Sequence, residues 1–193
     1  YTVSFSEPIA GMGGGDITVN GGTLDAGSVV VADGGMSATF SVTATQDSVA
    51  DLTVTINDTV LDLNGNILIE DTSDAETVDT VNPTITGIAS SFADTNNDDG
   101  VVSDDDAVVS YTVSFSEPIS GMGGGDITVN GGTLDANSVS VAEGGMLATF
   151  SVTATQDSVA DLTVTINDTV MDVHGNILIE DTSDAETVDT VNP

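Results

Sequence analysis

The stretch AVVSYTVSFSE, at residues 107–117, decides the fold of this chain. Its apolar side chains fall at every second position, on Val109, Tyr111, Val113 and Phe115. Successive side chains of an extended strand point to opposite faces, so this alternation predicts a strand with one face in a core and the other in solvent. The motif YTVSFSEPI that begins at Tyr111 also begins at Tyr1, so the strand belongs to a repeated unit.

Residues 1–83 and 111–193 are two copies of one sequence, aligned without a gap at a period of 110 residues. They differ at eight positions: Ala10/Ser120, Gly27/Asn137, Val30/Ser140, Asp33/Glu143, Ser37/Leu147, Leu61/Met171, Leu63/Val173 and Asn64/His174. Such fidelity over a long period predicts a tandem array. We expect a complete module at residues 84–193 and, at residues 1–83, a module that has lost its first strand and an acidic loop. The chain is expected to be an internal piece of a longer protein.

The rest of the module is also predicted to form strands, because its segments are rich in Val, Thr and Ile and are separated by residues typical of turns. The further predicted strands are residues 84–91, 126–130, 138–142, 146–154 and 162–167, with one more inside 177–190. The predicted inward side chains are Met146, Ala148, Phe150, Val152, Leu162, Val164 and Ile166. Seven short strands in about 110 residues predict an all-β chain of tandem immunoglobulin-like β-sandwiches.

Differences between the copies test which face of each strand points inward. Because side chains alternate between the two faces of a strand, Val30/Ser140 and Ser37/Leu147 are predicted to lie on the outer face. Leu61/Met171 and Leu63/Val173 exchange apolar side chains of similar size, which predicts partly buried positions.

Composition excludes several classes of function. The chain has 32 acidic residues, no Lys or Arg, one His and a formal charge of −32. Binding to nucleic acid or to anionic membranes depends on Lys and Arg, as do most enzymes that act on phosphates and carboxylates. We therefore expect no enzyme, no nucleic-acid partner and no membrane insertion. The chain has no Cys, so metal ions are the available cross-links.

The most acidic stretch is FADTNNDDGVVSDDD at residues 92–106, which holds six Asp and two Asn. Carboxylates packed this closely repel one another unless a cation lies among them, and the chain offers no Lys or Arg. Hard oxygen ligands without His or Cys favour Ca²⁺ over zinc or copper. The stretch is therefore predicted to be a calcium loop, and the alternative is a solvated acidic loop.

Two registers of this loop remain open. With Gly100 at the turn position of a twelve-residue calcium loop, Asn97 and Asp99 take the third and fifth positions, Val102 the apolar eighth and Asp106 the twelfth. The first position then falls on Thr95, one residue after Asp94. The second register uses Asp94, Asn96 and Asp98, and it closes with Asp104 or Asp105.

Several motifs together resemble one family. They are FSEPI (residues 5–9 and 115–119), GGGDITVNGGTL (13–24 and 123–134), TFSVTAT, and LDLNGN or MDVHGN (61–66 and 171–176). At this spacing the chain resembles the bacterial immunoglobulin-like repeats of large calcium-dependent RTX and biofilm-associated surface adhesins. The resemblance implies extracellular extender modules at the bacterial cell surface, which calcium rigidifies within and between modules. The acidic loop at 94–106 departs from this family's usual pattern.

A second calcium site is predicted between modules. In such a sandwich, the linker at residues 79–83 arrives at the same pole as the loops that follow FSEP and contain D-x-x-G-N. The predicted ligands there are Asp79, Asn82, Glu117 and Asp172, and Glu7 and Asp62 are the first-copy equivalents. The alternative is that Glu117 caps a strand end and that Asp172 is an ordinary turn residue. His174 is replaced by Asn64 in the first copy, so no metal role is expected of it.

These observations predict a calcium-rigidified spacer that projects a distal adhesive domain, with neighbouring modules of the same polypeptide as its partners. The first alternative is a module that binds a glycan or a protein. The second is an acidic surface-layer protein of a halophile, whose acids would be spread evenly rather than clustered.

Overall fold

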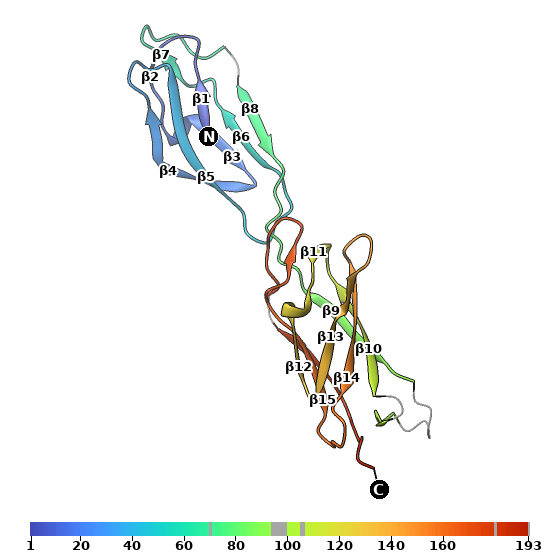
Figure 1. Ribbon diagram of the computed structural model, residues 1–193. Coiled ribbons are helices and arrows are strands. Elements are labelled where there is room, and N and C mark those ends of the chain that lie inside the picture. The colour runs from blue at the N-terminus through green and yellow to red at the C-terminus, as the bar shows by residue number, and fades with distance from the viewer. Residues whose placement is uncertain (70, 94–99, 105–106, 180, 193) are drawn as a thin grey trace. The chain divides into compact units, whose positions relative to one another are not determined.

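The chain forms two compact units, Tyr1–Val81 and Asn82–Pro193. The computed structural model describes residues 1–69, 71–93, 100–104, 107–179 and 181–192. Asp94, Asn96, Asp98, Asp99 and Asp106 of the predicted calcium loop lie outside these ranges. Figure 1 shows both units as sandwiches of strands, and each unit is described by itself below.

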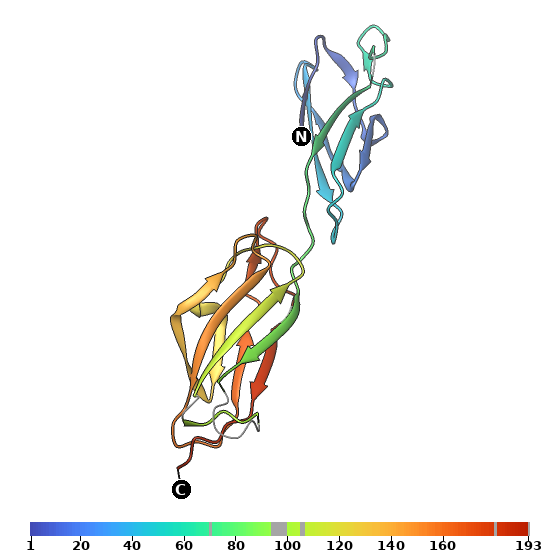
Figure 2. The ribbon, with the colours of Figure 1, turned by 90° about the vertical axis from the view of Figure 1, so that its right-hand side faces the viewer.

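The second unit consists of two sheets that face each other (Figure 2). One sheet contains, from edge to edge, β13 (Gly132–Val141), β14 (Leu147–Ala154), β10 (Val108–Phe115) and β9 (Ile85–Ser91). The other contains β12 (Ile127–Asn130), β15 (Leu162–Ile166) and β17 (Thr182–Glu186). A two-stranded ribbon joins β11 (Ile119–Gly121) and β16 (Met171–Asp172), and η3 (Gly124–Asp126) is a 3₁₀ turn. Taken as A to G along the chain, the seven main strands have the ABED and CFG order of the immunoglobulin sandwich, which confirms the predicted fold.

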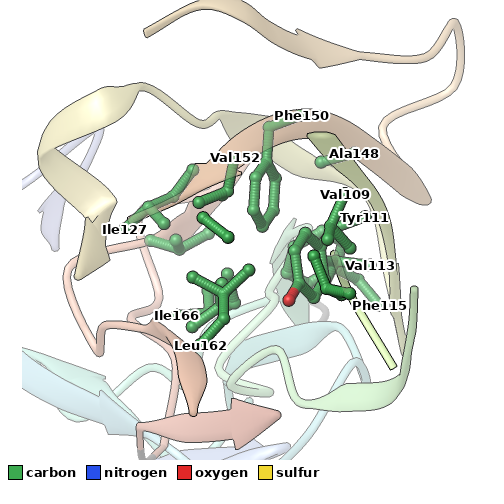
Figure 3. Packing of buried hydrophobic residues seen from close by; sticks show 14 of the residues in the cluster. Val109, Tyr111, Val113, Phe115, Ile127, Ala148, Phe150, Val152, Leu162 and Ile166 are labelled. Carbon is green, nitrogen blue, oxygen red and sulfur yellow. The ribbon is translucent and has the colours of Figure 1, made fainter. Parts of the chain in front are cut away.

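The core of the second unit lies between these sheets, and Figure 3 shows side chains from β10, β14, β12 and β15 pointing toward one another. Val109, Tyr111, Val113 and Phe115 on β10 are each no more than 2% exposed, as their alternation predicts. The Tyr111 ring stacks on Phe150 of β14 with centroids 5.2 Å apart. Leu162, Val164 and Ile166 of β15 are fully buried.

The predicted inner face of β14 is correct for Ala148, Phe150 and Val152 but wrong for Met146, which is 40% exposed. Met146 precedes β14, and its carbonyl accepts a hydrogen bond from the Phe115 amide, so it belongs to the turn rather than to the strand face.

The differing positions Val30 and Leu147 are 58% and 42% exposed, which agrees with their predicted outward phase. The prediction of partial burial is wrong for Leu61, Leu63, Met171 and Val173, which are all exposed. These residues flank Asp62 or Asp172, and it is the aspartate that turns inward. The alternation therefore holds in this turn, but a carboxylate occupies the inward position.

Strand β13 is longer than the sequence predicted. It begins at Gly132, directly after the predicted Asn130-Gly131 turn, and its pairing with β14 shifts register between Asp135 and Ser140. Gly131 has φ of 75°, and a Cβ at this position would lie 2.3 Å from the Asp161 carbonyl oxygen. Only glycine fits this turn, which is why the strand can start immediately after it.

The first unit repeats this architecture, except that no counterpart of β9 lies among the described residues. Its sheets are β1 (Thr2–Ser4), β5 (Ser37–Ala44) and β4 (Gly22–Val31), then β3 (Ile17–Asn20), β6 (Leu52–Ile56) and β8 (Thr72–Glu76). The ribbon is β2 (Ile9–Gly11) with β7 (Leu61–Asp62), and η1 (Gly14–Asp16) is the 3₁₀ turn. Among the described residues, β1 therefore pairs only with β5 and is an edge strand.

Candidate metal sites

The D-x-x-G-N motif folds into a tight turn around its aspartate. Asp172 Oδ1 accepts hydrogen bonds from the His174 amide at 2.7 Å and the Asn176 amide at 2.8 Å. Asp172 Oδ2 accepts one from Asn176 Nδ2 at 2.8 Å. Gly175, with φ of 93°, closes the turn. Asp172 is 1% exposed, and this arrangement gives a buried carboxylate the partners that burial requires.

The first unit contains the same turn around Asp62. Asp62 Oδ1 accepts from the amides of Asn64 and Asn66, and Oδ2 accepts from Asn66 Nδ2 at 2.7 Å. The turn forms with Asn64 in place of His174, and the backbone amide at this position donates to the aspartate in both units. Asp62 and Asp172 thus organise their turns, whether or not either binds a metal.

These hydrogen bonds alter the acidity of both carboxyls. The Asn66 side chain has the largest effect on Asp62 and lowers its pKa, and the amides of Asn66, Asn64 and Gly65 add to that. Burial has the largest single effect on Asp172 and raises its pKa. The donors of Asn176, His174 and Gly175 together outweigh burial, so the net pKa is lowered. Both turns therefore favour the charged carboxylate.

The predicted ligand Glu7 lies near this turn in the first unit. Glu7, Asp62 and Asn66 contribute to the lining of one hollow of about 270 Å³, together with apolar side chains of β2 and β7 and of the segments next to them. In the second unit, Glu117 is half-buried between β10 and β11, and Asp172 belongs to β16, which pairs with β11. The fold thus places the FSEP glutamate and the D-x-x-G-N aspartate on neighbouring segments of each unit.

The predicted calcium loop is described at residues 100–104. Gly100 has φ of 73°, the left-handed conformation expected of the turn glycine. Val102, the predicted apolar eighth position, is fully buried and forms a parallel bridge with Val188. Its amide donates to the Thr187 carbonyl at 3.0 Å, and its carbonyl accepts from the Asp189 amide at 2.9 Å. This part of the loop is therefore anchored to the last segment of the unit.

The two carboxylate oxygens of Asp104 have different surroundings. Its Oδ2 accepts a hydrogen bond from Asn192 Nδ2 at 2.6 Å. Its Oδ1 is shielded from solvent and has no hydrogen-bond partner among the described residues. A buried carboxylate oxygen without a donor is costly, and a chain without Lys or Arg cannot neutralise it internally. A hard cation would remove that cost, so Asp104 fits a calcium ligand.

Asn192 was missed as a site residue in the sequence. A signal was present, because Asn192 is the second-copy equivalent of Asn82, which was predicted as a linker ligand. In the first unit, the Asp79 carboxylate accepts from the Val81 amide at 3.0 Å. The predicted site of Asp79, Asn82, Glu117 and Asp172 draws on both units and stays a prediction.

Residues 1–82 match the family model described as bacterial Ig-like domain. Together with the strand order, this match supports a bacterial Ig-like domain in the first unit. The second unit carries the same sequence apart from the eight differing positions. No curated protein matches the chain. Among the described residues, no helix has the length and apolar character needed to cross a membrane.

Proposed function

We propose that this chain is a calcium-rigidified spacer from a bacterial cell-surface adhesin and that it performs no catalysis. Three observations support this proposal. Residues 1–82 match a bacterial Ig-like domain, the two copies are nearly identical, and the chain has no Lys or Arg with which to balance its acids. A repeated module suits a spacer because each copy adds the same length without a specialised surface.

The observation that carries the calcium part of the proposal is Asp104 Oδ1, a shielded carboxylate oxygen without a described donor. In the proposed site, Asp104 is one ligand of the ion, and the other ligands that the sequence predicts in this loop lie outside the described residues. Bound calcium supplies the positive charge that this loop lacks. It reduces repulsion among six aspartates that lie within 13 residues of sequence, from Asp94 to Asp106.

The contacts of the loop explain how calcium there would stiffen the unit. Asp104 is joined to Asn192 by a hydrogen bond, and Val102 is bonded to Thr187 and Asp189. Thr190, buried in the same segment, donates its hydroxyl to the Thr155 carbonyl at 2.7 Å. Residues 187–192 are thus held between the acidic loop and the body of the sandwich. Ordering the loop with calcium also orders this segment, which is a mechanical role.

The test compares the melting of the 193-residue chain in excess EGTA and in about 10 mM CaCl₂. A site with a Kd of about 10⁻⁴ M, at the tight end for extracellular modules, is then at about 100 times its Kd. Binding at that level stabilises the folded state by about 2.7 kcal/mol, so the second unit should melt roughly 10 °C higher. Small-angle scattering of the same samples should give a longer maximum dimension with calcium.

Asp104→Asn is the informative variant, and Glu143→Gln is its control. Both remove one negative charge from the second unit, but Glu143 is exposed and remote in sequence from the loop. Asp104→Asn should lose most of the calcium-induced rise, and Glu143→Gln should keep it. Equal melting with and without calcium, or an unchanged response in Asp104→Asn, would refute the calcium mechanism. A response to NaCl equal to that to CaCl₂ would favour the halophilic surface-layer alternative.

A further inference from the structure

The two D-x-x-G-N turns differ in the residue that precedes their glycine. Asn64 stands before Gly65 in the first unit, and His174 stands before Gly175 in the second. All four residues are exposed. Because the turn is exposed in both copies, its accessibility belongs to the module, and the two turns differ in chemistry rather than in contact with solvent.

An Asn–Gly pair can modify itself without an enzyme, and asparagine is among the thermally labile residues. The backbone nitrogen of the glycine loses its proton and attacks the side-chain carbonyl carbon of the asparagine. The bond from that carbon to the side-chain nitrogen breaks, ammonia leaves, and a succinimide ring remains. Water then opens the ring at either of its carbonyls and leaves an aspartate or an isoaspartate, whose main chain runs through Cβ and Cγ. Glycine favours this reaction because no Cβ shields its nitrogen. Histidine has no side-chain carbonyl and cannot undergo it.

The surroundings of Gly65 leave room for the ring. Gly65 has φ of 88°, and beyond its chain neighbours no described heavy atom lies within 4 Å of the position that a Cβ would take. Its amide donates to the Asp62 carbonyl at 3.2 Å, which is at the long end of the range for such bonds, so this nitrogen is weakly held. Asn64 and Gly65 thus combine a reactive sequence with an open, exposed turn.

The chain has two more Asn–Gly pairs, at residues 20–21 and 130–131, and both lie in crowded turns. A Cβ on Gly21 or Gly131 would lie 2.3 Å from a backbone carbonyl oxygen, that of Asp51 or Asp161 respectively. The carbonyl of each glycine also accepts a backbone hydrogen bond at 2.9 Å. A succinimide or a lengthened backbone fits there only after the turn opens, and such opening costs free energy. The fold therefore protects these two pairs.

We propose that Asn64 is a site of spontaneous deamidation and isomerisation, and that the fold directs this modification to the D-x-x-G-N turn of the first unit. Asp62 Oδ1 accepts from the amides of Asn64 and Asn66, both at 2.8 Å. Isoaspartate at residue 64 lengthens the main chain between these two amides, so they no longer converge on one oxygen. The aspartate product keeps the backbone but places a second carboxylate two residues from Asp62, which repels it. Ageing thus loosens the turn of the first unit and leaves that of the second intact.

The experiment ages the 193-residue chain in alkaline buffer with excess EGTA and maps the products by mass spectrometry. Since the chain has no Lys or Arg, pepsin takes the place of trypsin. Electron-transfer fragmentation then distinguishes isoaspartate from aspartate. In the folded chain, Asn64 should convert about tenfold or more faster than residues 20 and 130, which react only when their turns open. In concentrated urea the fold is lost, and the three sites should convert at similar rates.

Two variants exchange the residue at this position between the copies. Asn64→His should abolish conversion in the first unit, and it should keep the turn, because the second unit forms the same turn with His174. His174→Asn should create a new reactive site at residue 174, since Gly175, like Gly65, has no described heavy atom near the position of a Cβ. Ageing should lower the melting temperature of the first unit in the unmodified chain but not in Asn64→His.

The proposal is overturned if residue 20 or residue 130 converts as fast as Asn64 in the folded chain, or if residue 174 stays unmodified in His174→Asn. It is also overturned if ageing lowers the melting temperature of the first unit as much in Asn64→His as in the unmodified chain.

Discussion

The two units have nearly the same sequence but differ in how well their cores are covered. Phe5 and Phe115 sit in identical FSEPI motifs, yet Phe115 is 2% exposed and Phe5 is half-buried. Val3 with Val113 and Leu68 with Leu178 show the same contrast. None of these pairs is among the eight differing positions. The difference comes from β9, which pairs with β10 in the second unit and has no counterpart among the described residues of the first. Burial is thus decided by a partner strand that is remote in sequence from the residues it covers.

The largest expected effect is on the two FSEPI phenylalanines. Phe115→Ala should lower the free energy of unfolding of the second unit by about 3–5 kcal/mol, because it removes a fully buried ring and leaves a cavity. Phe5→Ala should cost the first unit only about 1–2 kcal/mol, because the ring is only partly buried. Hydrogen-exchange mass spectrometry in increasing urea can follow each unit through peptides that contain a differing residue. Equal losses in the two variants would contradict the contrast in burial.

The aspartate turns should behave alike in both units, since neither turn depends on β9 for its hydrogen bonds. The folded-state pKa of Asp62 and of Asp172 is lowered, relative to about 3.9 in an unfolded chain. The stability that each carboxylate contributes is therefore present above the unfolded pKa and is lost as the pH falls through the folded-state pKa.

We expect Asp62→Asn and Asp172→Asn each to destabilise its own unit at pH 7 and to reduce the dependence of that unit's melting on pH below about 5. The measurement is the melting temperature from pH 7 to pH 3 in excess EGTA, with Glu143→Gln as a charge control. A variant that keeps the full pH dependence of the unmodified chain would show that the turn is not responsible for it.

The smallest expected effect is that of exchanging the eight differing residues between the copies. Several are exposed in both units, among them Leu61/Met171 and Leu63/Val173, and exposed substitutions usually change stability by less than about 0.5 kcal/mol each. The exchanged chain should therefore keep the order in which the two units melt. If the order reverses, the eight residues and not β9 account for the difference between the units.

The strands and their inward faces could be predicted because alternation is local. Val109, Tyr111, Val113 and Phe115 needed only their spacing, and seven strands were enough for the sandwich. Met146 was misplaced because a strand end cannot be located by period alone. Leu61 and Leu63 were misplaced because an apolar residue was assumed to face inward. The inward position of that turn holds Asp62 instead. Hydrogen bonds from its own loop offset the cost of burying this carboxylate.

The sequence predicted which residue types a candidate calcium site would use, but not how the structure would arrange them. The clustering of aspartates at 94–106 indicated a cation, and Gly100 and Val102 take the conformation and burial that the first register expects. The sequence did not reveal that Asp104 would have one oxygen shielded without a described donor. It also did not reveal that Asn192, 88 residues away, would bind the other oxygen. Both depend on where the loop meets residues 187–192.

By itself, the sequence determined the class of fold and the repeat, and its 32 acids without Lys or Arg predicted an external cation. The reason is that side-chain periodicity and charge are properties of the chain whatever its path in space. The tertiary structure decided which aspartates organise a turn, and it decided that one oxygen of Asp104 has no hydrogen-bond partner among the described residues. It also decided how deeply the side chains of two identical strands are buried. These features depend on contacts between segments far apart in sequence, and the Phe of the same FSEPI motif is buried in one unit and half-buried in the other.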